Sequence, residues 1–276
     1  MDIEIAIGTW NFNLEYKNRD ISLPDIASKV RKELGVKYID LFDGHFHPEK
    51  DILDLSDRDV VEHAKKLCGE LTNEGLEVVG VSAINEFSVV GEIRDTGERL
   101  RKWLMVAPLL SIRFIRLSTE MWWLVEDNEF GLFDGKRMRS HLEDLLPHFP
   151  DDWDGYLVLE NHPLDIPSGQ AGERYIDEMI VAVMGHDRLA LCPDDGHMQW
   201  EDEDEWSAKF ARMVRHAKYA HLKCGEDAFG RGKPLPWDMR LKALEEAPAD
   251  GPLFVNLEHV GTGDPIPALE EAVLHL

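Results

Sequence analysis

The pattern that decides the fold is clearest in Tyr156-Leu157-Val158-Leu159-Glu160, a short apolar run that ends in a carboxylate. A run without polar alternation is typical of a parallel strand that is buried on both faces. The stretch 170–184 follows it and has the apolar periodicity of an amphipathic helix. A strand followed by a helix is the repeating unit of α/β folds.

The same unit recurs along the whole chain. The sequence predicts strands at 3–8, 36–42, 76–83, 111–117, 156–160, 189–192, 219–223 and 253–258. It predicts helices at 24–34, 56–74, 92–105, 135–146, 170–184, 206–217, 237–244 and 266–276. Eight such units in 276 residues predict one (β/α)8 TIM barrel as a single domain over residues 1–276. An open doubly wound sheet is the alternative, but no GxGxxG motif follows the first strand.

The composition excludes several classes of function. The chain has 30 basic and 54 acidic residues, a net charge of −24, and this charge disfavours nucleic acid and anionic membranes. No stretch resembles a membrane helix, and the acidic N-terminus does not resemble an export signal. The three cysteines form no CxxC pair, which favours a reduced, cytoplasmic location over a disulfide framework.

Ionisable side chains stand at the ends of the last four predicted strands. They are Glu160, Asp194, His221 and Glu258. A carboxylate directly after an apolar run is expensive to bury unless it is paired or bound to a metal. In a barrel the carboxyl ends of consecutive strands are neighbours on one rim, so these four groups could converge. Each alone is more often a salt-bridge partner or a hydrogen-bonded core residue, but four at successive strand ends favour a shared site.

Three carboxylates and one imidazole form a mainly hard, oxygen-rich ligand set. Such a set suits one divalent ion, with Mn²⁺ or Mg²⁺ preferred and Co²⁺ or Zn²⁺ also accommodated. Cys192 and Cys224 lie close by in sequence and could supply a thiolate, but buried packing is the expected role for each.

Most of the chain resembles the xylose isomerase-like barrel superfamily, and its first half does so only as a general barrel pattern. The resemblance is strongest within residues 156–264, in LVLENH, CPDDGH, AHLKCGEDAFGRGKPLPW and VNLEHVGTGDP. This superfamily contains sugar-phosphate isomerases and epimerases, inosose dehydratases and endonuclease IV, and its barrels are often oligomeric. The resemblance implies that Glu160, Asp194, His221 and Glu258 are metal ligands and that His197 contacts substrate or a further metal. The endonuclease pattern needs extra histidines, and the segment 224–233 contains none.

We therefore expect a metal-dependent isomerase or epimerase of a small carbohydrate. Glu160 and Glu258 would move a proton next to a carbonyl, and the metal would stabilise the enediolate. A lyase or dehydratase acting on a keto-inositol or modified sugar begins with the same proton abstraction and stays open. A non-catalytic binding barrel and an endonuclease IV-like nuclease are weaker alternatives.

Several side chains near the strand ends could contact such a substrate. The candidates are His197, His162, Arg231, Lys223, Trp10 and Trp122. His162 shares the side of an extended segment with Glu160, and tryptophan faces can pack on sugar rings. Each has an alternative: a structural ion pair for Lys223, solvation for Arg231, a loop position for His162 and core packing for the tryptophans. His45 and His47 are possible further ligands, or residues of a surface loop.

Overall fold

Eight parallel strands form a nearly closed barrel in the computed structural model, which describes residues 2–18, 20–83, 93–119, 134–161, 166, 168–225, 235–261 and 263–276. The strands are β1 Ile3–Gly8, β2 Tyr38–Phe42, β3 Glu77–Ser82, β4 Phe114–Ser118, β5 Tyr156–Glu160, β6 Leu189–Cys192, β7 Tyr219–Cys224 and β8 Leu253–His259. They pair in the order β6-β5-β4-β3-β2-β1-β8-β7. Isolated parallel bridges from Leu191 to Ala217 and from Asp194 to His221 join β6 to β7. The predicted (β/α)8 barrel is confirmed.

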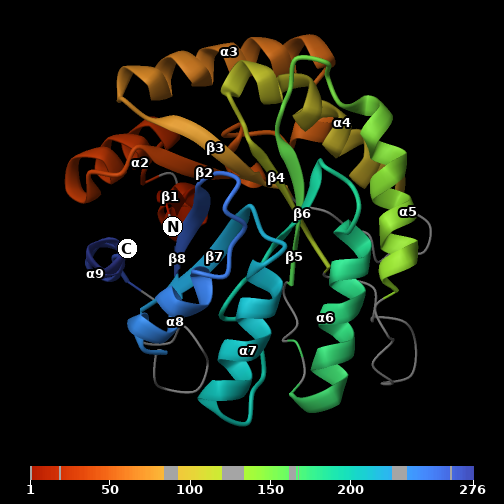
Figure 1. Cartoon of the computed structure of the whole chain (residues 1–276). Helices are drawn as coiled ribbons and strands as arrows, with labels where there is room; N and C mark the ends of the chain where they lie inside the picture. The colour runs from red at the N-terminus through yellow and green to blue at the C-terminus, as the bar shows by residue number, and fades with distance from the viewer. Residues whose placement is uncertain are drawn as a thin grey trace.

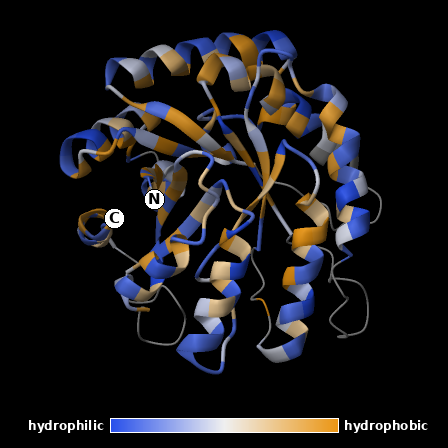
Figure 2. Cartoon of the chain, viewed as in Figure 1, coloured by the Kyte–Doolittle hydropathy of each residue, from blue (hydrophilic) through white to orange (hydrophobic). Residues whose placement is uncertain are grey.

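Helices surround the barrel on its outer side (Figure 1). They are α1 Asn13–Lys17, α2 Leu23–Lys29, α3 Asp57–Asn73, α4 Ile93–Leu110, α5 Gly135–Leu145, α6 Gly169–Val183, α7 Glu203–Val214, α8 Trp237–Leu244 and α9 Ile266–His275. Apolar residues concentrate on the strands and on the helix faces toward them, while polar residues cover the outside (Figure 2). This burial of one helix face against a covered sheet is the main stabilising element of the fold. Within the described residues, every helix is too short or too polar to cross a lipid bilayer.

Several helix boundaries differ from the prediction: α2 ends at Lys29 instead of residue 34, and α7 ends at Val214 instead of residue 217. Helix α4 continues beyond residue 105 and through Pro108 to Leu110. Proline usually ends a helix, but Val106 and Leu110 are buried in the core, and their packing outweighs the lost hydrogen bond. Helix α7 begins at Glu203 rather than Trp206, because Asp202 caps it by accepting a hydrogen bond from the Glu205 N–H at 2.9 Å.

A layer of side chains fills the barrel interior. It contains Ala6, Tyr38, Val79, Phe114, Val158, Ala190, Cys192, Tyr219 and Phe254. The rings of Phe114 and Tyr219 stack with centroids 4.8 Å apart, and Phe254 packs on Phe114 at 5.3 Å. The Tyr219 hydroxyl donates a hydrogen bond to Asp40 Oδ2 at 2.8 Å. This layer closes the barrel and supports the polar groups toward the carboxyl ends of the strands.

Gly80 leaves the space that Asp40 and Tyr219 occupy. A Cβ at this position would lie 2.5 Å from Asp40 Oδ2 and 3.1 Å from the Tyr219 hydroxyl oxygen. We expect Gly80→Ala to lower the free energy of unfolding by about 2 kcal/mol, because overpacking a filled interior forces its neighbours apart. Denaturant unfolding measures this. Gly69→Ala is the control: it lies in helix α3 with nothing within 4 Å of its Cβ and should stabilise by up to about 1 kcal/mol. Unchanged stability of Gly80→Ala would contradict the packing described.

Candidate metal centre

Strand register brings the four predicted ligands to one end of the barrel. Glu160 is the last residue of β5 and pairs with Cys192 of β6. Asp194 follows β6 and forms a parallel bridge with His221 of β7. Glu258 lies near the end of β8 and pairs with Lys223 of β7. The four side chains therefore come from adjacent positions on four consecutive strands.

All four groups are buried, and their polar atoms approach one another. Residue exposure is 1% for Glu160, 0% for Asp194 and His221, and 8% for Glu258. His221 Nδ1 lies 2.5 Å from Glu160 Oε1, 3.2 Å from Glu258 Oε1 and 4.0 Å from Asp194 Oδ2. Ligand atoms of Asp194, His221 and Glu258 all lie within 4.8 Å of one another. So do those of Glu160, Cys192 and His221.

The chemistry of this donor set fits a divalent cation. His221 Nδ1 makes no hydrogen bond of normal geometry, although the carboxylate oxygens are close enough for one. A buried nitrogen in this situation normally has a partner, and the neutral form of this imidazole could give its lone pair to a metal. Carboxylate oxygens with one imidazole match the preferences of Mg²⁺ or Mn²⁺, and also accept Co²⁺ or Zn²⁺. Burial raises the pKa of the Cys192 thiol to about 11, so a thiolate ligand is disfavoured at neutral pH.

Charges inside the barrel set the protonation of these groups. Burial alone would raise the pKa of Glu258, but the charges of Lys223 and His221 hold it well below its usual value. Burial alone would lower the pKa of His221, whereas the neighbouring Cys192, Glu160 and Glu258 hold it well above its usual value. Because the Cys192 thiol is neutral near pH 7, we assign this effect on His221 to the two carboxylates. Ionised carboxylates are the form that binds a metal.

A second group of polar residues, buried or largely buried, surrounds the candidate ligands. Arg116 of β4 places Nη1 3.1 Å from Glu160 Oε2. Asn256 of β8 donates a hydrogen bond to Glu258 Oε1 at 3.2 Å. Asp40 of β2 accepts hydrogen bonds from Ser82 and Tyr219. None of these was predicted. The sequence carried one kind of signal, since Arg116 and Asp40 are charges inside the apolar segments Phe114–Ser118 and Tyr38–Phe42.

The turn after β6 is held rigidly. The Asn161 amide donates to the Asp194 carbonyl at 2.9 Å and accepts from the Asp194 N–H at 2.7 Å. Asp194 Oδ1 accepts from the Gly196 N–H at 2.8 Å. Asp195 points the other way and pairs with the buried Arg240 at 2.5 Å. Asp194 is thus directed at the candidate metal centre, and Asp195 is directed at helix α8.

The structure also places the predicted substrate contacts. His197 Nε2 lies 4.0 Å from Asp194 Oδ2, and its side chain is 22% exposed. Trp10 is 45% exposed and packs edge-on against Phe42, beyond β1. Lys223 is buried and pairs with Asp194 and Glu258. His162, Arg231 and Trp122 lie outside the described residues.

Within the described part of the chain, neither His45 nor His47 belongs to a group of candidate metal ligands. His45 Nδ1 lies 3.1 Å from Thr9 Oγ1, and its Nε2 lies 3.2 Å from Asn13 Oδ1. His47 Nδ1 accepts hydrogen bonds from the Glu49 and Lys50 N–H groups. His45 therefore ties the segment after β1 to the segment after β2.

His45 should make the fold sensitive to acid. Burial lowers the pKa of His45 to about 4 from an ordinary 6.5. Between these values the unfolded chain binds a proton that the folded chain does not, so stability falls as pH falls from 6.5 to 4. We expect a loss of up to about 3 kcal/mol from this residue. Denaturant unfolding of His45→Gln across this range should show a flatter pH dependence than the wild type; parallel curves would contradict the assignment.

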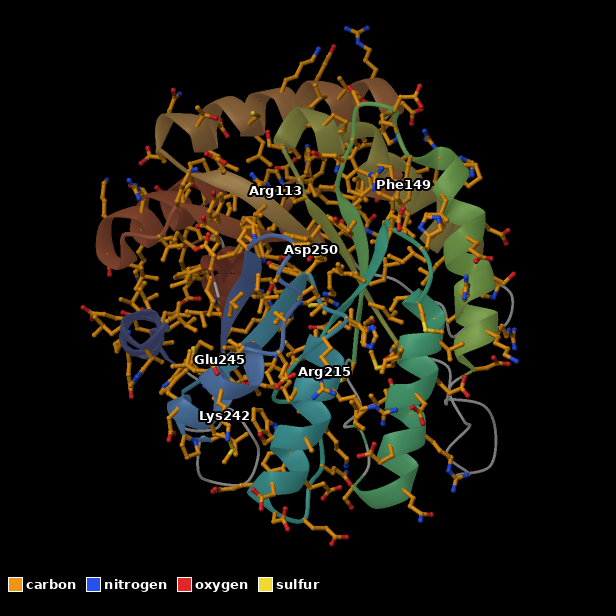
Figure 3. All side chains as sticks on the ribbon, viewed as in Figure 1. Arg113, Phe149, Arg215, Lys242, Glu245 and Asp250 are labelled. Carbon is orange, nitrogen blue, oxygen red and sulfur yellow. The ribbon has the colours of Figure 1, made fainter. Side chains whose placement is uncertain are left out.

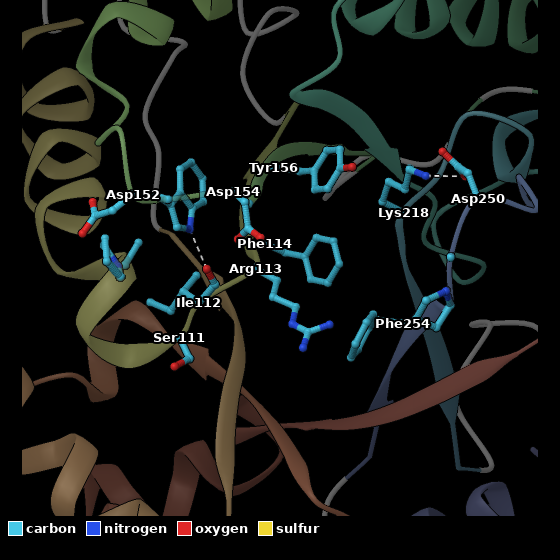
Figure 4. Close-up of a pocket in the computed structure, with 16 residues that line it drawn as sticks. Ser111, Ile112, Arg113, Phe114, Asp152, Asp154, Tyr156, Lys218, Asp250 and Phe254 are labelled. Atoms are coloured by element: carbon cyan, nitrogen blue, oxygen red, sulfur yellow. Dashed lines mark hydrogen bonds and ion pairs between the residues drawn. The ribbon is translucent and has the colours of Figure 1, made fainter.

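A pocket lies at the opposite end of the barrel. It measures about 650 Å³ and is lined by residues that precede or begin β4, β5, β7 and β8, among them Arg113, Tyr156, Lys218 and Phe254. Figure 3 labels Arg113 and Asp250 over the centre of the ring of strands. Figure 4 shows Lys218 paired with Asp250, and Arg113 directed toward the Phe254 ring. Because active sites of such barrels lie at the carboxyl ends of the strands, this pocket is separate from the candidate centre.

Comparison of the sequence with family models gives one match. The model described as xylose isomerase-like TIM barrel covers residues 29–276. Among curated proteins, none matches the chain in sequence.

Solved structures share the fold at low sequence identity. The probable 3-DHS dehydratase AsbF of Bacillus anthracis has 16% identity and a TM-score of 0.68, with 99% of each chain covered. A xylose isomerase-like barrel protein of Mycobacterium smegmatis in complex with magnesium has 17% identity and a TM-score of 0.61, covering 99% of this chain and 95% of that one. D-psicose 3-epimerase of Clostridium cellulolyticum H10, solved with D-tagatose, has 14% identity and a TM-score of 0.58, covering 98% and 89%. These likenesses establish the fold alone.

Proposed function

The chain belongs to the xylose isomerase-like TIM barrel family, and from this premise we propose that it is a divalent-metal-dependent isomerase or epimerase. Its substrate would be a sugar or a related polyhydroxy-carbonyl compound. The observation that supports the proposal is the approach of three carboxylates to the buried His221 Nδ1, with oxygen atoms of Glu160, Glu258 and Asp194 at 2.5, 3.2 and 4.0 Å. A similar fold occurs in an epimerase solved with a ketose and in a protein solved with magnesium.

Glu160 and Glu258 are the proposed acid and base. They stand on β5 and β8, which are not adjacent, so they can approach opposite faces of a substrate at the carboxyl end of the barrel. One would remove the proton next to the carbonyl, and the other would return it on the neighbouring carbon or the opposite face. Their roles exchange when the reaction runs in reverse.

The remaining polar groups would bind and orient the substrate. His197 is partly exposed beside Asp194 and could donate a hydrogen bond to a substrate hydroxyl. His162, Arg231 and Trp122 are proposed substrate contacts from the sequence, and Trp10 offers an exposed aromatic face. A divalent ion held by the four ligands would act as a Lewis acid that shares the negative charge developing on adjacent substrate oxygens.

A lyase or dehydratase is the second candidate. The similar fold of a probable 3-DHS dehydratase favours it. Such a reaction also begins with proton abstraction next to a carbonyl, but the intermediate then loses water or another group instead of being protonated again. The same ligands and the same two glutamates serve both reactions.

Proton nuclear magnetic resonance in D₂O distinguishes these proposals. The purified protein would be loaded with Mg²⁺, because paramagnetic Mn²⁺ broadens the proton signals. It would then be incubated with ketoses, ketose phosphates and a keto-inositol. An isomerase or epimerase incorporates deuterium next to the carbonyl and forms a sugar of unchanged composition. A dehydratase forms an unsaturated product and releases water. Absence of deuterium exchange and of product in a metal-loaded protein, across all three classes, would contradict both candidates.

A further inference from the structure

A buried lysine lies inside the candidate metal centre. Lys223 is on β7, two residues after His221, and its side chain is 6% exposed. Its Nζ lies 2.7 Å from Asp194 Oδ2 and forms a second ion pair with Glu258 Oε2. One ammonium therefore bridges two of the four candidate ligands, at the place where a cation is needed.

Hydrogen bonds fix the backbone of Lys223, whereas its side chain is a long stem with several rotatable bonds. Its N–H donates to Asp195 Oδ1 at 2.8 Å, and its carbonyl accepts from Arg240 Nη2 at 2.7 Å. Asp195 and Arg240 are themselves paired and buried. The long, flexible stem can thus withdraw its charge from the two carboxylates without disturbing β7.

The buried carboxylates of the site need a cation beside them. Three buried carboxylates, Glu160, Asp194 and Glu258, lie beside two cationic side chains, Arg116 and Lys223. Without Lys223, Asp194 and Glu258 would repel each other in a medium where unpaired charges are very costly. With a divalent ion present, the ammonium would instead repel the ion at close range.

We propose that Lys223 is a resident counter-cation that competes with the metal. In the metal-free protein it holds Asp194 and Glu258 together, and it yields these carboxylates when a divalent ion binds. The inference rests on the proposed function, because it assumes that the four ligands bind a metal. It assigns to Lys223 a positioning role in place of a direct contact with substrate.

Two opposite effects follow from removing this charge. The metal-free protein loses stability, because two buried carboxylates are left facing each other. Metal binding becomes tighter, because the ion no longer displaces an ammonium. A lysine with a purely structural role would lower stability and leave metal affinity unchanged or weaker.

Lys223→Met tests the proposal, with metal affinity measured by isothermal titration with Mn²⁺ and thermal unfolding measured with EDTA or with Mn²⁺. We expect about tenfold tighter Mn²⁺ binding, a lower Tm in EDTA and a larger upward shift of Tm on adding Mn²⁺. Lys209→Met is the matched control, because Lys209 is also fully buried and pairs with Glu205 at 2.6 Å on helix α7. It should lower Tm in both conditions and leave Mn²⁺ affinity unchanged.

These measurements distinguish a failure of the role proposed for Lys223 from a failure of the proposed function. A folded Lys223→Met that binds Mn²⁺ no more tightly than wild type overturns the counter-cation role. A wild-type protein that binds no divalent ion overturns the proposed function itself. If Lys223→Met does not fold in EDTA, Lys223→Gln keeps a polar head group without charge and is measured in the same way. Folding of Lys223→Met that is recovered by Mn²⁺ also supports the proposal.

Discussion

Replacing Glu160 with glutamine is expected to lower kcat/KM by about a thousandfold or more, because it would remove the proposed base and a proposed metal ligand in one step. The amide is nearly isosteric with the carboxylate, so the shape of the site is kept. It cannot accept a proton, and it cannot balance Arg116 at 3.1 Å or His221 at 2.5 Å. Deuterium exchange at the carbon next to the substrate carbonyl measures the loss directly.

The control for this variant is Glu62→Gln. Glu62 is an exposed partner of Arg58 on helix α3, and its replacement should leave turnover unchanged. Because Glu160→Gln leaves a buried arginine without its carboxylate, we also expect a loss of stability of about 3 kcal/mol. Circular dichroism shows whether the variant remains folded at the assay temperature. A folded Glu160→Gln protein with wild-type deuterium exchange would exclude Glu160 from the chemistry.

Removing divalent ions should be the second largest perturbation. Dialysis against a chelator is expected to lower turnover by about a hundredfold or more, because Lewis-acid stabilisation supplies several kcal/mol to the transition state. Adding Mn²⁺ or Mg²⁺ should restore turnover, and Co²⁺ or Zn²⁺ can also occupy this oxygen-rich set. Elemental analysis of the dialysed protein verifies that the metal has gone.

A monovalent salt at matched ionic strength is the control for this experiment, because the net charge of −24 makes the protein sensitive to screening by any cation. Recovery with K⁺ alone would point to charge screening. Full turnover in protein shown to contain no divalent ion would contradict the metal-dependent mechanism.

Most strands could be predicted because their apolar runs are unbroken. β5 and β6 begin and end at the predicted residues, since short buried strands have sharp sequence boundaries. Other boundaries depend on tertiary contacts that one sequence does not display. Packing of Val106 and Leu110 carries α4 through a proline, and the side-chain cap at Asp202 starts α7 one turn early. The short helix α1 has too few residues to show a period.

The site was predictable to the extent that it follows from strand order. Glu160, Asp194, His221 and Glu258 stand at successive strand ends, and closing the barrel brings such ends together. The residues that surround them were not predictable in the same way. Asp40 reaches the interior from β2, and its partner Tyr219 lies 179 positions further along the chain. Contacts of this kind depend on the closed barrel and leave no local pattern.

Lys223 illustrates the difference between finding a residue and assigning its role. Its position two residues after His221 indicated that it could reach the site, and it left substrate contact and ion pairing as alternatives. Only the pairing of β7 with β8 places Lys223 beside Glu258. The alternatives then differ in a measurable way, through metal affinity.

The central claim is that four side chains from four strands share one divalent ion. Anomalous diffraction from crystals soaked in Mn²⁺ tests it most directly. We expect one strong peak at the carboxyl ends of the strands, with atoms of Glu160, Asp194, His221 and Glu258 all within about 2.5 Å of it. A peak bound by other residues, or a fully soaked crystal with no peak between these four side chains, would contradict the claim.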